Sequence, residues 1–468
     1  MTGFPRHLPP SAAIAARSAH GIALPPHWPG ASARQPHPMQ ALLGLGAFTF
    51  AGLAIAATLT LSPSMLTHWK IQYATSGGTF LEKLHPATYL TCIALVLVVL
   101  RSGNPFAGLV SVFGRSKTTL LYLVCWVLLL AQTVMLQRPF TGIVDTFLLP
   151  LLLATLLWQL SPLQRSFLVP LMHGLILLNV VIGYHEYFAG HRIIPLTLGN
   201  VLVVGEWRSA ALLGHPLVAS GVVAAYVLIL SLNPRSCSQP WLRLPLIAIC
   251  LGSLMVFGGR TALVTTLGIL ALAAVARIFG LMRGARISLP ALITAILVLF
   301  AALAIVFAAL NLGLFDKMLL RFSSDKGSTL ARYATWQFLS YFDWWEILFG
   351  PSIARANALQ NQLGLDYGIE NFWIASTVQF GLLHALMISA ALVGFLAMIL
   401  RQSAPAALAI VVLMTVIAAS SVSFSSKNLQ LSQFVILMIV LLPKAAPAQR
   451  VIITPQRLPP RRDLRMVR

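Results

Sequence analysis

The chain has 468 residues, of which 58% are hydrophobic and only 9% are charged. Soluble domains carry about 25% charged residues, so the composition excludes an ordinary soluble protein and indicates a polytopic membrane protein. The formal net charge of +21 would suit nucleic acid. However, the basic residues gather in particular loops and tails, and no basic helix is interleaved with aromatic residues. We therefore do not expect nucleic acid as a partner.

The two ends of the chain differ in composition from the rest. Residues 1–39 are rich in Pro, His and Arg and lack the apolar run and cleavage site of a signal peptide. We expect a disordered cytoplasmic tail there, followed by a transmembrane domain over residues 40–443. Residues 444–468 are predicted to form a basic cytoplasmic tail.

Long apolar runs in the central region predict an all-α, polytopic integral membrane protein with about twelve transmembrane helices. The predicted spans cover residues 40–62, 87–100, 118–136, 140–160, 167–184, 210–232, 244–258, 261–277, 288–311, 371–400, 405–422 and 429–442.

Charge along these segments predicts their orientation in the membrane. If both termini are cytoplasmic and the spans alternate, most of the 32 basic residues fall inside, as the positive-inside rule requires. Only Asp463 among the acidic residues is then cytoplasmic. Asp145 lies near the outer end of a span, and the other acidic residues face outward. This arrangement is self-consistent and places the functional residues on the outer face of the membrane.

Two outer segments are long, at residues 185–209 and 312–370, and loops of that length are usually functional. The second contains the sequence STLARYATWQFLSYF, which predicts a helix from Ser328 toward Asp343. The tryptophans that follow suit the aromatic belt of a membrane interface. We therefore expect a long outer loop with a helix that lies along the membrane surface.

Arg260 follows Gly258 and Gly259 between two apolar runs, in the stretch MVFGGRTALVTT. A charge in this position is expensive and often functional. Arginine offers a planar fork of donors that matches phosphate oxygens, and glycine permits close approach of a ligand. The alternative is a snorkelling arginine that anchors a helix end.

Three further residues of the mid-chain region are candidates for binding the same ligand. Arg208 precedes a span, although it could simply pair with Glu206. Arg192 could be an ordinary solvated loop charge. His215 is predicted one or two turns inside the span, where a histidine needs a partner, and it could equally be a satisfied histidine of the bundle interior.

The late loop adds an arginine and a carboxylate. Arg332 and Trp336 are four residues apart and share a helix face, although Arg332 could pair with Asp325 or Asp343 on the surface. Glu370 and Asn371 open the span that begins ENFWIASTVQF. Glu370 could cap this helix, or it could act as a general base that takes a proton from a sugar hydroxyl.

The candidate arginines and Glu370 converge on one side of the predicted membrane. Clustered arginines without matching acids favour an anionic ligand, and phosphate is the anion most often held in this way. No Asp-x-Asp pair, P-loop or metal-ligand spacing occurs, and the four cysteines are not spaced as metal ligands. We therefore expect metal-independent catalysis without a cofactor, in which arginines neutralise a leaving pyrophosphate.

The order of these features resembles the O-antigen ligase and Wzy-type polysaccharide polymerase superfamily, and within it the VpsF-type exopolysaccharide polymerases. The resemblance covers roughly residues 190–400. It is carried by the stretches RSAALLGHP (208–216), GGRTALV (258–264), RYATWQF (332–338) with LFGP (348–351), and ENFWIASTVQFGLL (370–383).

The resemblance implies a glycosyltransferase of the bacterial inner membrane that acts at its periplasmic face. Its donor and acceptor would be oligosaccharides linked to undecaprenyl pyrophosphate, and its other candidate partners are a flippase and chain-length or export proteins. The implied catalytic residues are Glu370, Arg260 and Arg332, and the implied substrate-binding residues are Arg208, Arg192, His215, Trp336 and Asn371.

One departure from the family pattern favours a polymerase. Ligases of this superfamily commonly carry a histidine before the asparagine, where this chain has Glu370. A single displacement with one base would invert the anomeric carbon. The alternatives are a ligase that moves a finished glycan onto lipid A–core or protein, a transporter for an anionic solute, and a scaffold of an export complex.

Overall fold

The computed structural model describes residues 38–444, except for 76, 115, 199–200, 204–207, 238, 285–299, 301–306, 308–310, 312, 314–315, 317–327, 366–367 and 425. The described elements of the first half are α1 (Pro38–Thr60), α2 (Pro63–His68), α3 (Pro86–Arg101), α4 (Pro105–Phe113), α5 (Lys117–Met135), α6 (Thr141–Ile143), the π-helical η1 (Val144–Leu148), α7 (Leu149–Gln159), α8 (Pro162–Ala189), β1 (Thr197–Leu198), β2 (Val201–Leu202), η2 (Ala211–Leu213) and α9 (Pro216–Leu232).

Those of the second half are η3 (Pro234–Ser236), α10 (Pro240–Phe257), α11 (Arg260–Met282), α14 (Ser328–Gln337), η4 (Phe338–Tyr341), α15 (Trp344–Phe349), α16 (Ile353–Gln362), α17 (Phe372–Phe380), α18 (Leu382–Gln402), α19 (Ala407–Ser420), η5 (Val422–Phe424) and α20 (Gln430–Leu441). The two short strands pair antiparallel as a hairpin.

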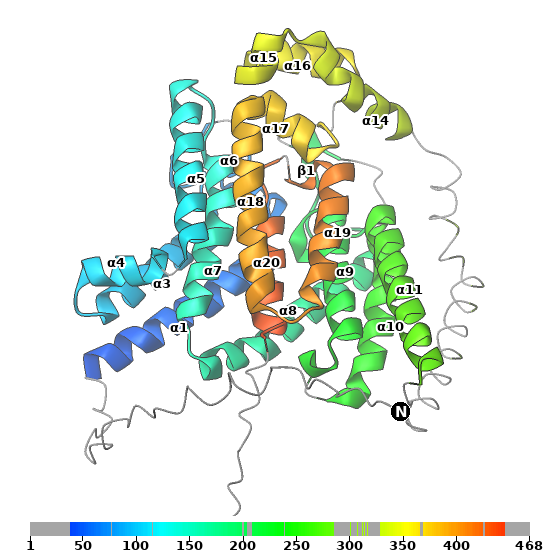
Figure 1. The fold of residues 1–468 in the computed structure, drawn as a ribbon. Coiled ribbons are helices and arrows are strands. Elements are labelled where there is room, and N and C mark those ends of the chain that lie inside the picture. Colours follow the sequence, from blue (N-terminus) through cyan, green and yellow to red (C-terminus); the bar gives the residue numbers. More distant parts are fainter. Residues whose placement is uncertain are drawn as a thin grey trace, which may run out of the picture.

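The described helices form a bundle, and the short helices α14, α15 and α16 lie across one end of it (Figure 1). Seven helices of this part of the chain are long and apolar enough to cross a membrane: α1, α5, α6 with η1 and α7, α8, α10, α11 and α18. The prediction of an all-α membrane protein with several spans is therefore confirmed.

Four shorter apolar helices, α3, α9, α19 and α20, coincide with further predicted spans. The predicted span at 288–311 lies almost entirely outside the described residues, as do both tails. The total of twelve spans and the periplasmic orientation therefore stay predictions.

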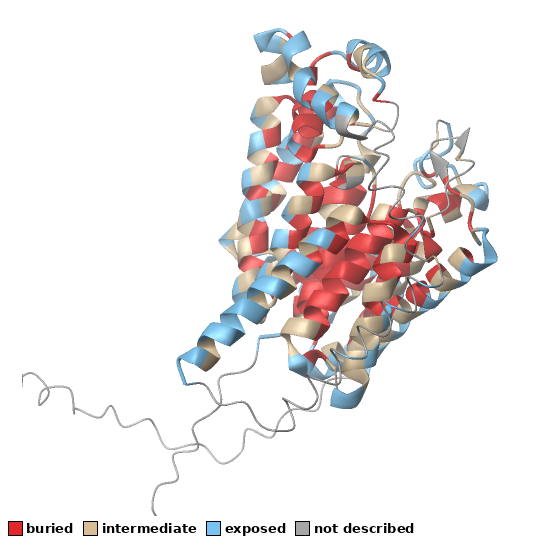
Figure 2. Ribbon diagram, turned by 90° about the vertical axis from the view of Figure 1, so that its right-hand side faces the viewer, coloured by how far each residue is buried: buried red, intermediate tan, exposed pale blue. Residues whose placement is uncertain are grey.

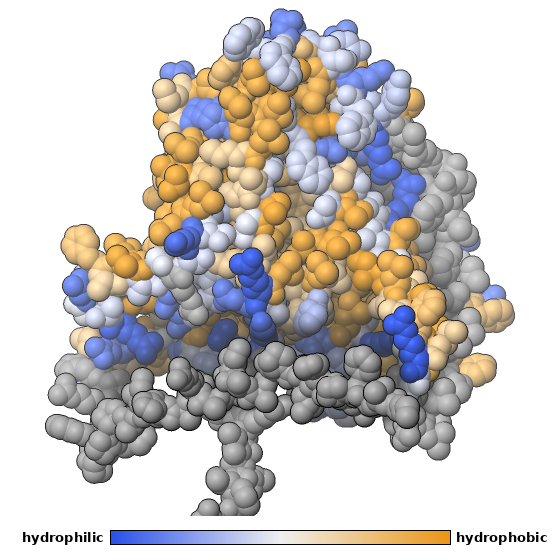
Figure 3. Space-filling model, viewed as in Figure 1, coloured by the Kyte–Doolittle hydropathy of each residue, from blue (hydrophilic) through white to orange (hydrophobic). Residues whose placement is uncertain are grey.

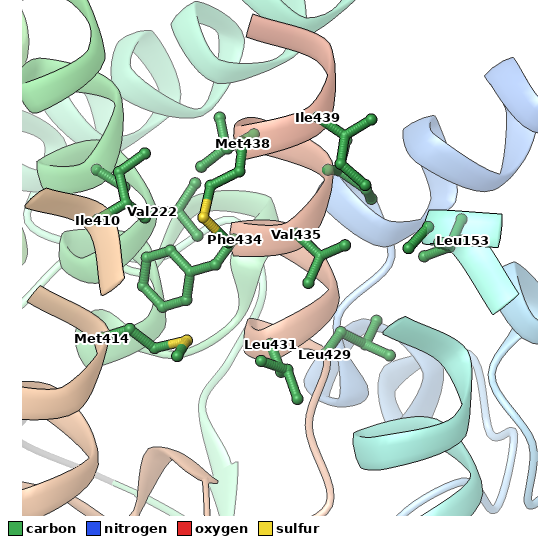
Figure 4. Packing of buried hydrophobic residues seen from close by; sticks show 14 of the residues in the cluster. Leu153, Val222, Ile410, Met414, Leu429, Leu431, Phe434, Val435, Met438 and Ile439 are labelled. Carbon is green, nitrogen blue, oxygen red and sulfur yellow. The ribbon is translucent and has the colours of Figure 1, made fainter. Parts of the chain in front are cut away.

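The core of the bundle is built on α20, in which every residue is buried. Phe434 and Met438 of α20 point toward Val222 of α9 and Ile410 of α19 (Figure 4). The buried residues concentrate in the middle of the bundle (Figure 2). A helix that is apolar on all sides belongs inside a protein or a membrane, and the part of α20 from Phe434 to Leu441 is of this kind and packs among other helices.

The outer helices keep large apolar side chains exposed. Hydrophobic residues cover much of the bundle surface (Figure 3), including Leu121 and Val124 of α5 and Leu272 and Phe279 of α11. Water would penalise such a surface, whereas lipid tails would not. The bundle therefore suits a lipid bilayer.

Backbone contacts join the loops at the end that carries α14 to α17, which we call the α14 end. The Ser64 hydroxyl donates to the Gly214 carbonyl oxygen (3.4 Å), and the Ser209 amide donates to the Val256 carbonyl oxygen (3.3 Å). These contacts join α2, the loop before α9 and the end of α10 to one another.

The predicted span at 371–400 is two helices, α17 and α18, which meet at Gly381. Gly381 has φ of 79° and ψ of 155°, a conformation that is essentially restricted to glycine. A Cβ at this position would lie 2.5 Å from the carbonyl oxygen of Leu348 in α15. The chain breaks here because the backbone of α15 occupies the space that a straight helix would need.

We predict that Gly381→Ala lowers the unfolding midpoint of the detergent-solubilised protein, at a cost of about 1–3 kcal/mol or more. The matched control is Gly364→Ala, because Gly364 also has a positive φ (65°) but has no atom within 4 Å of the position that a Cβ would occupy. Thermal unfolding followed by intrinsic fluorescence measures both variants. Equal shifts would contradict the close approach of α15.

Candidate functional site

Four of the predicted site residues line one small cavity at the α14 end. The cavity has a volume of about 100 Å³ and is lined by Arg332, Thr335, Trp336, Glu370, Asn371, Ala419 and Ser420. A water molecule needs about 10–15 Å³ of the same measure, so the cavity accepts a group of several heavy atoms. We call it the Glu370 pocket.

Three elements that are distant in the sequence build the Glu370 pocket. Helix α14 supplies Arg332 and Trp336 from one face, as their spacing predicts. Glu370 and Asn371 precede α17, and the last residues of α19 complete the wall.

Arg332 and Glu370 form an ion pair across this pocket. Nε of Arg332 lies 3.5 Å from Oε2 of Glu370, and the two side chains are 48% and 26% exposed. A long, partly exposed pair is weak, so both groups remain accessible to a ligand. Of the two surface partners considered for Arg332, Asp325 lies outside the described residues and Asp343 instead caps α15.

Asn371 is the residue that caps α17. Its Oδ1 accepts hydrogen bonds from the Trp373 and Ile374 amides (3.0 and 3.1 Å), and its Nδ2 donates to the Ala419 carbonyl oxygen (3.2 Å). Asn371 thus ties α17 to the end of α19. The side-chain cap proposed as the alternative role of Glu370 is made by its neighbour.

Arg192 contacts the backbone at Arg208. Nε of Arg192 donates to the Arg208 carbonyl oxygen at 2.8 Å, and its Nη2 donates to the same oxygen. Arg192 is therefore a structural link between the two ends of the loop that follows α8, and not an ordinary solvated charge. Glu206, the alternative partner of Arg208, lies outside the described residues.

Glu186, which the sequence pattern does not single out, organises the same loop. Its carboxylate is 3% exposed and accepts three backbone hydrogen bonds, from the amides of Ile193, Ala210 and Ala211 (3.0, 2.9 and 3.0 Å). The predicted span ends at residue 184, whereas α8 continues to Ala189. Glu186 is thus in the last turns of a helix, and the loop that folds over it supplies the hydrogen-bond donors to its side chain.

Arg260 and His215 both lie at helix starts. Arg260 is the first residue of α11, after Gly258 in a left-handed conformation, and a Cβ on Gly259 would overlap Ser220 of α9. His215 is the N-cap of α9, where its Nδ1 accepts from the Leu217 amide (3.2 Å). The prediction that His215 lies inside the span is wrong, because α9 begins only at Pro216.

The predicted residues therefore divide into two sets. Arg332, Trp336, Glu370 and Asn371 line the Glu370 pocket, whereas Arg192, Arg208, His215 and Arg260 are not part of its lining. The second set belongs to loops and helix starts that share the same end of the bundle, through the contacts of Ser64 and Ser209.

A second polar cluster surrounds Asp145, which is fully buried in η1. Its carboxylate accepts hydrogen bonds from the Tyr73 hydroxyl (2.9 Å), the Thr88 hydroxyl (2.7 Å) and the His85 amide (3.2 Å). The ammonium group of Lys427 lies 3.9 Å away. An aspartate in an apolar run is a signal for such a cluster, but the partners come from three other segments that the sequence does not connect.

Lys427 is held by the backbone as well as by charge. Its Nζ donates to the carbonyl oxygens of Tyr73 (3.0 Å) and Lys83, and lies 3.7 Å from the centre of the Tyr73 ring. Burial lowers the pKa of Lys427 to about 8, against the opposing effect of Asp145. Burial, with Asp145 adding to it, raises the pKa of Tyr73 well above its usual value.

No family model matches the chain, and neither a curated protein nor a solved structure is significantly similar to it. Within the described residues, no group of three or more His, Cys, Asp and Glu side chains is placed to hold a metal ion.

The geometry around His85 predicts acid sensitivity. His85 contacts the Leu61 carbonyl oxygen through Nε2 (2.7 Å) and accepts from the Ala87 amide through Nδ1 (3.1 Å), which requires a neutral ring with its hydrogen on Nε2. Burial lowers the pKa of His85 to about 4. Between pH 6.5 and 4 the unfolded chain therefore binds a proton that the folded protein does not bind, so stability falls as the pH falls through this window.

We expect the His85 contribution to cost about 3 kcal/mol of unfolding free energy over this window. Because carboxylates titrate there too, the measurement is the difference between wild type and His85→Asn, whose side chain can keep the cap on α3. Thermal unfolding at a series of pH values should show that the variant loses less stability than wild type as the pH falls. Parallel curves would contradict a neutral, buried His85.

Proposed function

We propose that this protein is a polysaccharide polymerase of the bacterial inner membrane. It would transfer a glycan from undecaprenyl pyrophosphate to a hydroxyl of a second lipid-linked repeat unit, at the periplasmic face. The observation that carries the proposal is the Glu370 pocket, in which a carboxylate and a guanidinium from distant segments face the same space. Both groups belong to stretches that resemble the polymerase superfamily.

The chemistry requires a base for the acceptor hydroxyl and a cation for the leaving pyrophosphate. The acceptor oxygen attacks the anomeric carbon and its proton passes to the Glu370 carboxylate, while the bond from that carbon to the phosphate oxygen breaks. Arg332 is placed to stabilise the negative charge that develops on the leaving pyrophosphate. Because the attack displaces the leaving group in one step, the anomeric configuration inverts.

Arg260 and Arg208 would hold the pyrophosphate of the donor. They lie at the α14 end, at the start of α11 and in the loop before α9. Arg192 supports this loop through the Arg208 carbonyl oxygen, and His215 fixes the start of α9. Trp336, which is 70% exposed beside the pocket, offers a flat apolar surface to a sugar ring.

We predict that Arg260→Ala lowers transfer by about a hundredfold or more, and that Arg260→Lys also loses at least about tenfold. A lysine cannot reproduce a fork of donors on two phosphate oxygens. The matched control is Arg277→Lys, an exposed arginine later in the same helix. Activity near wild type in Arg260→Lys would make Arg260 a helix anchor.

We predict that Glu370→Gln lowers transfer by about 10²- to 10⁴-fold, the usual contribution of a general base, while donor binding is retained. Binding of the lipid-linked donor to the purified variant and turnover in the same preparation separate the two effects. An equal loss of binding and turnover would make Glu370 a structural residue. Retained anomeric configuration in the polymer would contradict the single displacement.

The function is tested by sizing polyprenyl-linked glycans from cells that lack this gene, re-supplied with wild type or with Arg260→Ala. Single repeats that accumulate in the deletion and the variant, with long polymer lost, support the polymerase. Long lipid-linked polymer that accumulates unattached would instead indicate a ligase. An unchanged lipid-linked pool would contradict glycosyl transfer and favour a transporter of an anionic solute.

A further inference from the structure

A second and much larger cavity opens at the α14 end. Its volume is about 720 Å³, within the range of about 300–1,000 Å³ that is typical of ligand sites. Its walls come from the loop after α2, from the turn between α5 and α6, from α16 and α17, and from the segment that follows η5. We call it the Lys83 cavity.

The charges on its lining are all positive. Lys83, Arg138 and Lys427 line the cavity, and no aspartate or glutamate among the described residues does so. The nearest compensating carboxylate in the Asp145 cluster is fully buried behind the lining, 3.9 Å from Lys427. Glu82, the neighbour of Lys83 in the chain, also interacts with it, so two carboxylates beside three cations still leave an excess of positive charge at the cavity.

Backbone carbonyls hold these cations in place without neutralising them. Arg138 donates to the carbonyl oxygens of Pro351 (2.6 Å) and Gln379, and thereby joins the turn after α5 to the start of α16 and the end of α17. Lys83 donates to the Thr75 carbonyl oxygen. Carbonyl dipoles orient a cation but carry no net charge, so a bound anion would still gain a charge-assisted contact.

The rest of the lining combines uncharged polar groups with apolar faces. Hydroxyl and amide groups come from Thr133, Thr141, Asn357 and Gln360, and aromatic faces come from Phe147 and Phe424. Hydroxyls and amides can satisfy a ligand rich in hydroxyl groups, and the aromatic faces suit the apolar side of a sugar ring.

The Lys83 cavity also adjoins the Glu370 pocket. Ile369 lines the large cavity, and the next two residues, Glu370 and Asn371, line the small pocket. A ligand in the Lys83 cavity would therefore lie beside the carboxylate to which the proposed function assigns the proton transfer.

We propose that the Lys83 cavity binds the acceptor glycan through an anionic group, a sugar carboxylate or a phosphate, so that the enzyme polymerises an acidic repeat unit. This inference rests on the proposed function and names its substrate class. Lys83, Arg138 and Lys427 bind the charged group of the sugar. The segment from Ile369 to Asn371, which joins the cavity to the Glu370 pocket, brings a hydroxyl of this sugar to Glu370.

The test is equilibrium binding to the full-length protein in nanodiscs of uncharged phosphatidylcholine. The probes are a hyaluronan tetrasaccharide, which carries carboxylates, chitotetraose as a neutral tetrasaccharide, and inorganic pyrophosphate. We expect the hyaluronan tetrasaccharide or pyrophosphate to bind at least about tenfold more tightly than chitotetraose. Pyrophosphate binding that depends on Lys83, when the acidic tetrasaccharide does not bind, would identify phosphate as the anionic group, and the reverse would identify the carboxylate.

The variant is Lys83→Glu, and the matched control is Lys70→Glu, which makes the same charge change at an exposed lysine of the same loop that does not line the cavity. Lys83→Glu should weaken anion binding at least about tenfold, because it replaces an attractive charge on the lining with a repulsive one. Lys70→Glu should leave binding near wild type. If Lys83→Glu is not folded, as judged by its thermal midpoint, Lys83→Gln replaces it with the same expected direction.

Equal affinity for neutral and anionic probes, or equal loss in the two charge-reversal variants, would overturn the inference. The composition of the polymer distinguishes this failure from failure of the proposed function. If the cells make a neutral polymer and need Glu370 to make it, the hypothesis of an acidic acceptor is refuted and the polymerase function stands. If anion binding depends on Lys83 but deletion of the gene leaves the lipid-linked glycans unchanged, the polymerase function is refuted and the assignment of the cavity as an anion site stands.

Discussion

The buried carboxylate of Asp145 is the constraint on which the α14 end depends. A charge inside an apolar bundle is tolerated only when hydrogen bonds and an opposite charge surround it. Its partners Tyr73, His85, Thr88 and Lys427 come from the loop before α3, from α3 itself and from the segment before α20. These segments must therefore reach into the bundle.

The same constraint shapes the proposed site. Lys427 belongs both to the Asp145 cluster and to the lining of the Lys83 cavity. Arg138 is a corresponding link on the other wall, where it holds the start of α16 and the end of α17 together. The break at Gly381 lies directly after this contact and lets α15 approach α17 and α18. The segment that carries Glu370 is consequently supported from two sides, by Arg138 through α17 and by Asn371 through the end of α19.

Apolar runs and turn residues predict the helices of this protein well, because hydrophobic length and helix-capping chemistry are local properties. The run at 40–62 is α1 from Pro38 to Thr60, and the spacing of Arg332 and Trp336 correctly places both on one face of α14. The errors occur where distant chain segments decide the local structure. Gly381 breaks a run that reads as continuous because α15 lies against it, and Glu186 and Asp145 acquire their roles only from loops that fold onto them.

The distribution of carboxylates explains why the α14 end can attract an anion. Glu186 and Asp145 are both buried, and their oxygens accept hydrogen bonds from the backbone amides and hydroxyls that fix the loops. The carboxylates of Glu186 and Asp145 are thus enclosed within the fold, whereas the guanidinium groups of Arg138 and Arg332 line cavities. Low-dielectric walls strengthen the field of such cations. Glu370 lines the pocket with Arg332, 3.5 Å from its Nε. In the proposed reaction, an anionic glycan held by the surrounding cations would bring its hydroxyl to this carboxylate.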